Sequence, residues 1–236
     1  MILGTEGMTM SVDPLRHISV FPPHAFGARR VDVIGCGATG SHVVLSLAKL
    51  GVENIHVWDF DTVEAHNIAN QAFGLDDVGA LKVEALTRLV HHSTGVRVEP
   101  HTEKVDGSQS FGEVVFLLTD TMASRKEIWE RGLRFKPQNK LVIETRIGAD
   151  SGRIYAFNPS KLRHVREWEK TLCSDAEAEV SACGASISVG PTAEIIAGLA
   201  AWQMIRWFSI EQGGEDELDN EIILSLRSMV AISRQF

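Results

Sequence analysis

The stretch Val31-Asp-Val-Ile-Gly35-Cys-Gly37-Ala-Thr-Gly40 decides the fold of this chain. Its first four residues form a mostly apolar run of the kind found in buried strands, and residues 41–50 carry apolar side chains at helical spacing. Glycines at 35, 37 and 40 allow a tight turn and a close approach of the backbone to a bound group. The stretch therefore predicts a strand, a glycine loop and a helix in succession.

The same alternation of short apolar runs and helical spacing continues along the chain. It predicts strands at residues 55–58, 96–98, 114–118, 141–147, 153–157 and 221–226, and helices at residues 81–90, 122–135 and 192–208. Strands that alternate with helices form a mostly parallel sheet, and the short turn Asp150-Ser-Gly152 is typical of an antiparallel hairpin. We therefore expect an α/β, Rossmann-like fold: a mostly parallel sheet with helices on both faces and an antiparallel C-terminal extension.

Length and composition fit one globular unit. The chain has 236 residues, of which 44% are hydrophobic, and this is enough to build a core. We expect a single domain over residues 1–236, with an N-terminal segment at 1–28 and a crossover connection of little periodicity at 160–185. The apolar run at 189–208 is interrupted by Glu194, Gln203 and Arg206, so we interpret it as a core helix and expect no membrane association.

Charge and cysteine content exclude other classes of protein. The 31 aspartates and glutamates outnumber 23 lysines and arginines, and the net charge of −8 argues against nucleic acid as a partner. Three cysteines, at 36, 173 and 183, are too few for a disulfide scaffold. The N-terminal residues also lack the pattern of a secretion signal, so we expect a cytoplasmic protein.

A nucleotide site is predicted by the glycine loop together with Asp59, which ends the second strand. A helix N-terminus offers unpaired N–H groups to phosphate, and a carboxylate at this strand end can accept hydrogen bonds from ribose hydroxyls. These features alone fit an NAD-dependent oxidoreductase as well as another protein that binds an adenine nucleotide. Asp59 and Asp61 are also compatible with ordinary acids at a strand end and turn.

Further motifs follow in a fixed order. They are Asp59-Phe-Asp61-Thr-Val-Glu-Ala-His-Asn67-Ile-Ala-Asn-Gln71, then Gly79-Ala-Leu-Lys82, then Thr119-Asp120 with Arg125. This series over residues 30–130 resembles the ThiF/MoeB/HesA family, which belongs to the superfamily of ubiquitin-activating enzymes. Cys183-Gly-Ala-Ser-Ile-Ser-Val-Gly190 is also similar to the family's C-terminal core. An oxidoreductase would account for neither Lys82 nor the Thr119-Asp120 pair.

The resemblance implies an ATP-dependent adenylyltransferase that uses Mg²⁺ and acts as a homodimer. Its partner would be a ubiquitin-like or sulfur-carrier protein ending in Gly-Gly, whose C-terminal carboxylate becomes an acyl-adenylate. Lys82 would neutralise charge at the α-phosphate, Asp120 would hold Mg²⁺, and Arg125 would orient the neighbouring loop. The implied nucleotide-binding residues are Gly35, Gly37, Ala38, Thr39, Gly40, Asp59, Asp61, Asn67, Asn70, Gln71 and Lys82. Without the resemblance, Lys82 would be a surface lysine, and Asp120 also suits the cap of the next helix.

Two features depart from the family pattern. Asn70 stands where the family usually has an arginine, and an amide cannot replace a guanidinium charge at the phosphates. Unless the catalyst is weaker, another cation has to compensate; Arg16 is a candidate, because an N-terminal arginine reaches the partner subunit's site in bacterial relatives. The chain also has no C-x-x-C pair, so it cannot build the four-cysteine zinc site of many relatives.

The cysteines bear on a step after adenylation, because some family members pass their partner on through a thioester or an acyl disulfide. Cys173 in the crossover connection and Cys183 before the last helix are the candidate nucleophiles. Basic residues at 163, 164 and 166 would favour a Cys173 thiolate, whereas acids at 175–179 would oppose it. Three alternatives stay open: no catalytic cysteine, a catalytically weakened nucleotide-binding scaffold, and a dehydratase-type relative acting on a small or tRNA-linked carboxylate.

Overall fold

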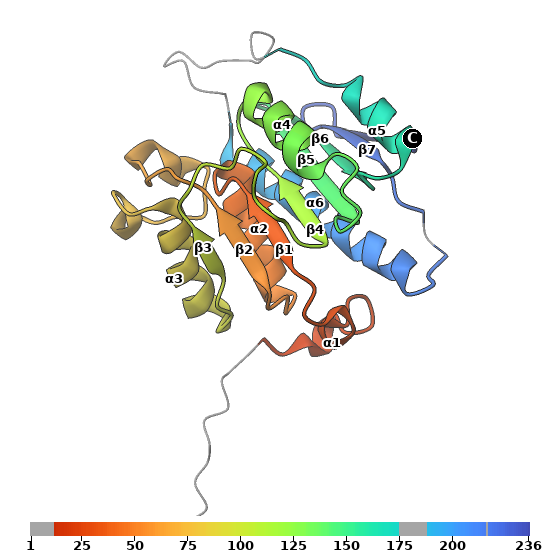
Figure 1. Cartoon of the computed structure of the whole chain (residues 1–236). Helices are drawn as coiled ribbons and strands as arrows, with labels where there is room; N and C mark the ends of the chain where they lie inside the picture. The colour runs from red at the N-terminus through yellow and green to blue at the C-terminus, as the bar shows by residue number, and fades with distance from the viewer. Residues whose placement is uncertain (1–11, 175–187, 216) are drawn as a thin grey trace, which may run out of the picture.

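A single sheet organises the chain, and the computed structural model describes residues 12–174, 188–215 and 217–236. Within these residues the sheet has the strand order β3-β2-β1-β4-β5-β6-β7-β8 (Figure 1). The first five strands in this order are parallel, and β6, β7 and β8 continue it antiparallel. The strands are β1 (Val31–Ile34), β2 (Ile55–Trp58), β3 (Glu99–His101), β4 (Val114–Leu117), β5 (Leu141–Ile147), β6 (Ser151–Phe157), β7 (Glu221–Ser225) and β8 (Val230–Arg234).

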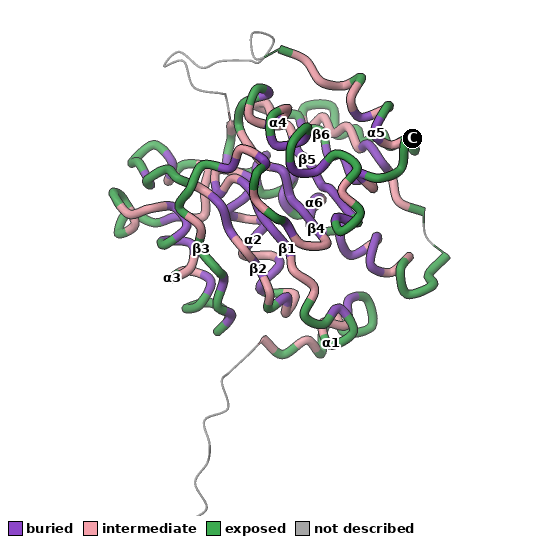
Figure 2. Tube along the Cα trace, viewed as in Figure 1, coloured by how far each residue is buried: buried purple, intermediate pink, exposed green. Residues whose placement is uncertain are grey.

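Helices cover both faces of the sheet. They are α1 (Pro23–Phe26), α2 (Ala38–Lys49), α3 (Lys82–Thr94), α4 (Met122–Ile128), α5 (Leu162–Glu169) and α6 (Gly190–Glu211). Buried side chains of α2, α3 and α6 form one core with alternate residues of the sheet, and those of α4 and α5 form a second core on the other face. Figure 2 shows the central strands β1, β4 and β5 largely buried between these layers. The expected α/β, Rossmann-like fold with an antiparallel C-terminal extension is therefore confirmed.

The sequence placed some elements incorrectly. The strand expected at 96–98 lies instead at β3, where Glu99 pairs with His56. The helix expected at 122–135 ends at residue 128 and continues as a wider π-helical turn over Trp129–Leu133. Residues 160–185, expected to have little periodicity, contain α5, whose only buried side chains are Val165 and Trp168. The sequence also gave no sign of β8, because all five of its residues are exposed.

The expected core helix is confirmed by α6, which is buried along most of its length. Its apolar residues pack against α2 and against β5 and β6, with Gln203 enclosed among them. Gln203 donates a hydrogen bond to the Asp219 carbonyl at 2.7 Å, and Arg206 pairs with the Asp219 carboxylate at 2.6 Å. Among the described residues, no helix has the length and apolar character needed to cross a membrane.

Asp32 in β1 is a fully buried charge that joins several elements. Its carboxylate accepts hydrogen bonds from Arg30, from the Trp58 indole at 2.8 Å and from the Gly112 amide at 2.7 Å. Each oxygen therefore has at least two donors, which offset the cost of removing the charge from water. Asp32 anchors the segment before β4 to the middle of the sheet.

Replacing Asp32 should destabilise the fold strongly. We expect Asp32→Ala to lower the free energy of unfolding by about 3 kcal/mol, because the Trp58 and Gly112 donors would remain buried without an acceptor. Urea denaturation followed by tryptophan fluorescence measures this loss. The matched control is Asp76→Ala, an exposed aspartate, which should change stability by less than about 0.5 kcal/mol. Equal effects of the two substitutions would contradict the role given to Asp32.

Candidate functional site

The glycine loop makes two close contacts between β1 and α2 that a larger residue would prevent. Gly35 has a φ of +96°, and a Cβ atom there would lie 2.6 Å from the Leu118 carbonyl oxygen. A Cβ atom on Gly40 would lie 1.9 Å from the Gly35 carbonyl oxygen. Gly37 precedes α2 and provides no side-chain cap, so the helix begins without one. This leaves the helix N-terminus open to an anionic ligand.

A cavity of about 620 Å³ opens in front of this loop, at the carboxyl ends of β1, β2 and β4. Part of its wall is apolar and includes Ile34, Val105, Leu118 and Ile128, while the rest is polar and charged. The predicted site residues that line it are Gly35, Gly37, Ala38, Asp59, Asp61, Asn67, Asn70, Gln71, Lys82 and Asp120. Two further predicted residues, Thr39 and Gly40, are buried in the first turn of α2.

Lys82 and two aspartates form a charged cluster in this cavity. Lys82 Nζ lies 2.9 Å from Asp61 Oδ2, and the lysine side chain is only 10% exposed. Burial opposes the charge of Lys82, but the nearby Asp59 and Asp61 carboxylates outweigh burial and raise its pKa. Lys82 is therefore a largely buried, charged residue of the cavity and not an ordinary surface lysine.

Asp59 stabilises the glycine loop through hydrogen bonds. Its Oδ2 atom accepts a hydrogen bond from the Cys36 amide at 2.7 Å, and its Oδ1 atom accepts one from the Asp61 amide at 2.9 Å. Burial raises the pKa of Asp59, although Lys82 and the two amides act in the opposite direction. The Cys36 side chain is fully buried, and burial raises the pKa of its thiol well above the usual value. Cys36 therefore fills space and is no candidate nucleophile.

Three buried oxygen atoms beside the cavity have no hydrogen-bond partner among the described residues. They are Asn70 Oδ1, Gln71 Oε1 and Thr119 Oγ1. Asn67 differs, because its Oδ1 atom accepts a hydrogen bond from a backbone amide at 2.9 Å. Buried polar atoms in folded proteins are normally paired. These three atoms therefore fit a cavity that is completed by a polar ligand.

Arg125 of α4 holds the loop that carries Asp120. Its side chain is buried, and Nη2 donates a hydrogen bond to the Thr119 carbonyl at 2.6 Å. Its Nε atom lies 3.0 Å from Glu144 in an ion pair. Arg125 thus positions the residue immediately before Asp120, which agrees with the orienting role expected for it.

The surroundings of Asp120 fit a metal ion that is shared with a ligand. Thr121, and not Asp120, caps α4, because its side chain accepts the Ser124 amide. Within residues 12–174, 188–215 and 217–236, no group of three or more His, Cys, Asp or Glu side chains is arranged to hold a metal. Mg²⁺ commonly takes one or two carboxylates and completes its shell with water and substrate phosphates. Asp120 as one such carboxylate of the cavity suits that arrangement.

Two residues of this region were not recognised in the sequence. Glu144 is fully buried and supports Arg125, and its only signal was an acidic residue that interrupts the strand predicted at 141–147. Lys104 lines the cavity from the loop after β3 and belongs to none of the recognised motifs.

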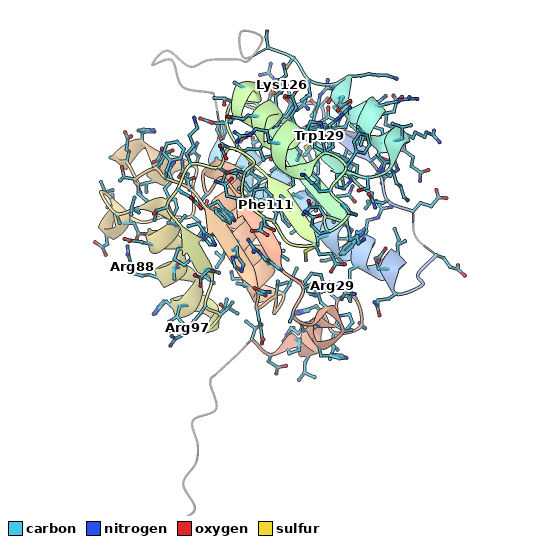
Figure 3. The ribbon with its side chains drawn as sticks, in the orientation of Figure 1. Arg29, Arg88, Arg97, Phe111, Lys126 and Trp129 are labelled. Atoms are coloured by element: carbon cyan, nitrogen blue, oxygen red, sulfur yellow. The ribbon has the colours of Figure 1, made fainter. Side chains whose placement is uncertain are left out.

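Cys173 lies at the described end of the crossover connection and does not line the cavity. Lys126 of α4, labelled in Figure 3, donates a hydrogen bond to the Cys173 carbonyl at 2.8 Å. Arg146 of β5 donates one to the Thr171 carbonyl at 2.6 Å. Burial opposes the charge of Arg146, but Glu144 chiefly, with a smaller contribution from Cys173, raises its pKa. Lys126 and Arg146 therefore hold the segment before and at Cys173. The other candidate nucleophile, Cys183, lies outside the described residues.

Arg16 is not brought to the cavity of its own chain. It ends an exposed turn, Pro14–Arg16, that precedes α1. The next residue, His17, contacts the Leu50 carbonyl just after α2, at the end of this helix opposite the glycine loop. A role of Arg16 in the site of a partner subunit stays a prediction.

These features define an α/β protein with a ligand cavity at the carboxyl ends of parallel strands, beside a glycine loop and a helix N-terminus. The profile of the ThiF family matches residues 24–228. The chain belongs to the ThiF family.

Curated relatives match part of the chain. The Nedd8-activating enzyme E1 catalytic subunit of Drosophila melanogaster is 34% identical over 110 residues, which are 44% of this chain and 24% of that protein. Ubiquitin-like modifier-activating enzyme 5 of Drosophila ananassae is 28% identical over 94 residues, which are 39% of this chain and 24% of that protein. The chain thus aligns with about a quarter of the length of these relatives.

Solved structures share the fold over most of the chain. MccB of E. coli with ATP has a TM-score of 0.66 at 18% identity, with 88% of this chain and 63% of MccB covered. PaaA has a TM-score of 0.66 at 20% identity, with 94% of this chain and 76% of PaaA covered. Identities this low establish the fold and no more.

The contact between Gly40 and Gly35 should make Gly40 irreplaceable. We expect Gly40→Ala to lower the free energy of unfolding by about 2 kcal/mol or more, because the added Cβ would overlap the Gly35 carbonyl. Gly37→Ala is the matched control, since the nearest atom to its Cβ would be Gln71 Nε2 at 4.0 Å, and its cost should stay below about 1 kcal/mol. Chemical denaturation of both variants measures the difference. If both variants lost the same unfolding free energy, the close contact between Gly40 and Gly35 would not explain the cost of Gly40→Ala.

Proposed function

We propose that this chain is an adenylating enzyme that binds ATP with Mg²⁺ and converts a carboxylate into an acyl-adenylate. The observation that carries the proposal is one cavity that joins an uncapped helix N-terminus, the enclosed Lys82 and the carboxylate Asp120. An adenosine phosphate needs this combination of amide donors, a cation and a metal-binding carboxylate. Membership of the ThiF family supports the same reaction class.

The two parts of the cavity suit the two parts of the nucleotide. The apolar wall, with Val105, Leu118 and Ile128, offers a surface for the adenine ring. The glycine-loop amides and Lys82 lie at the polar part, where the phosphates would bind. Asp120 would hold Mg²⁺ there, and the bound ion would neutralise phosphate charge.

The reaction would be an in-line displacement at the α-phosphorus. A carboxylate oxygen of the substrate forms the new P–O bond, and pyrophosphate leaves with the electron pair of the broken bond. Negative charge spreads over the α-phosphate oxygens as this happens, and Lys82 would stabilise it. Lys82 is suited to this role because its pairing with Asp61 keeps it charged and fixes its position.

The names of the relatives point to a protein substrate. Enzymes named as activating Nedd8 and another ubiquitin-like modifier are similar to this chain over about two fifths of its length. The proposed partner is therefore a ubiquitin-like or sulfur-carrier protein ending in Gly-Gly. We further propose that the enzyme is cytoplasmic and works as a homodimer, in which Arg16 has a partner site to reach.

A scaffold that binds a nucleotide without catalysis is the second candidate. Asn70 favours it, because the amide removes a cation that the family usually places at the phosphates. ATP binding without turnover, with every partner tested, would support the scaffold over the enzyme.

Loss of Lys82 or Asp120 should stop adenylation. With a Gly-Gly protein encoded nearby as substrate, we expect ATP–pyrophosphate exchange to fall about 100-fold or more in Lys82→Ala and in Asp120→Ala, because charge on the α-phosphate would lose its stabilisation. Lys140→Ala, an exposed lysine before β5, is the matched control and should exchange normally. If no such protein supports exchange and Asp120→Ala leaves ATP binding unchanged, the proposal fails.

A thioester step would use one of the two candidate cysteines. The thiolate would attack the acyl-adenylate carbonyl, forming a thioester and releasing AMP. We expect a thiol-sensitive adduct between enzyme and partner on non-reducing gels, and we expect Cys173→Ser to abolish it, since Lys126 and Arg146 lie beside Cys173. An adduct that survives Cys173→Ser but not Cys183→Ser would move the role to Cys183. Absence of any adduct would exclude the step.

A further inference from the structure

We infer that Lys104 binds the nucleotide phosphates and replaces the cation that Asn70 cannot provide. The inference deepens the proposed function and depends on it. It assigns a phosphate-binding role to a residue outside every motif recognised in the sequence.

The charges around the cavity require such a cation. Among its lining residues are the carboxylates Asp59, Asp61, Glu64, Glu103 and Asp120, against the two lysines Lys82 and Lys104. This surplus of negative charge would repel a strongly anionic triphosphate. Mg²⁺ at Asp120 would relieve part of the repulsion, and the remainder calls for a positive side chain free to approach the phosphates.

Lys104 is the available cation. Lys82 is already paired with Asp61 at 2.9 Å. Among the lysines and arginines that line the cavity, Lys104 alone has no ion-pair partner within 4 Å in the described part of the chain. Arg16, the alternative cation, is not brought to this cavity within its own chain. Lys104 can therefore turn toward a ligand without breaking an existing pair.

The backbone around Lys104 is held in place. Val105 is buried in the core on the α4 side. The Gln109 side chain accepts hydrogen bonds from the Asp106 and Gly107 amides at 3.3 and 3.2 Å and donates one to the Lys104 carbonyl at 3.4 Å. A Cβ atom on Gly107 would lie 2.9 Å from Arg131 Cβ, which shows how closely this loop packs on the turn after α4. The loop thus presents Lys104 to the cavity from a fixed base.

The experiment compares nucleotides of decreasing charge by titration calorimetry of the full chain with Mg²⁺. We expect Lys104→Ala to weaken ATP binding about tenfold, because a charge-assisted contact is lost, and to change AMP binding less than about twofold. Lys104→Arg should keep the ATP affinity. Asn70→Arg placed in the Lys104→Ala background should restore it, since the cation would return from the family's usual position. Lys140→Ala is the control for removing an exposed lysine.

Three results overturn the inference, and a fourth separates it from the proposed function. If Lys104→Ala matches Lys140→Ala, Lys104 is only a solvated surface lysine. If Lys104→Ala weakens the binding of ATP and of AMP by the same factor, Lys104 contacts the nucleoside or stabilises the loop and does not bind the phosphates that ATP has beyond AMP. Wild-type protein that binds ATP but shows no pyrophosphate exchange would refute the proposed function. The role of Lys104 would then be judged from the loss of ATP affinity relative to the loss of AMP affinity in Lys104→Ala. Wild-type protein that binds no ATP would refute both.

Discussion

One buried carboxylate, Glu144 in β5, supports both the candidate site and the segment that carries Cys173. It is fully buried and lies 3.0 Å from Arg125, 3.0 Å from Arg146 and 3.1 Å from the Trp168 indole nitrogen. An unpaired charge in the core costs several kcal/mol. The two guanidinium groups and the indole offset this cost, so they have to lie beside Glu144. The sheet therefore determines where both arginines lie.

Each arginine in turn positions a segment with a proposed function. Arg125 donates to the Thr119 carbonyl and so fixes the loop that carries Asp120. Arg146 donates to the Thr171 carbonyl and side chain and so fixes the approach to Cys173. The proposed metal ligand and the proposed nucleophile thus depend on the same carboxylate, although they lie on different segments. A change at Glu144 would disturb both steps of the proposed reaction.

The sequence predicted the features that repeat along the chain or follow an ordered motif. Apolar runs were enough for β1, β2 and β4 to β7, and the spaced motifs predicted Lys82 and Asp120, which both line one cavity. The failures have physical reasons: β8 is exposed throughout, α5 buries only Val165 and Trp168, and the π-helical turn after α4 carries no pattern distinct from a helix. Lys104 was missed because only the folded loop brings it to the cavity.

The departure at Asn70 changes more than a charge. Its amide donates to the Ser188 carbonyl at 3.4 Å, just where the described chain resumes before α6. Two residues further on, a Cβ atom on Gly190 would lie 2.8 Å from the Ala69 carbonyl, so the two segments pack closely there. A short amide fits this crowded contact, whereas a long guanidinium side chain would have to extend past it into the cavity. In this chain, position 70 therefore helps to hold the start of α6, and in the proposed function the positive charge for the phosphates would come from another loop.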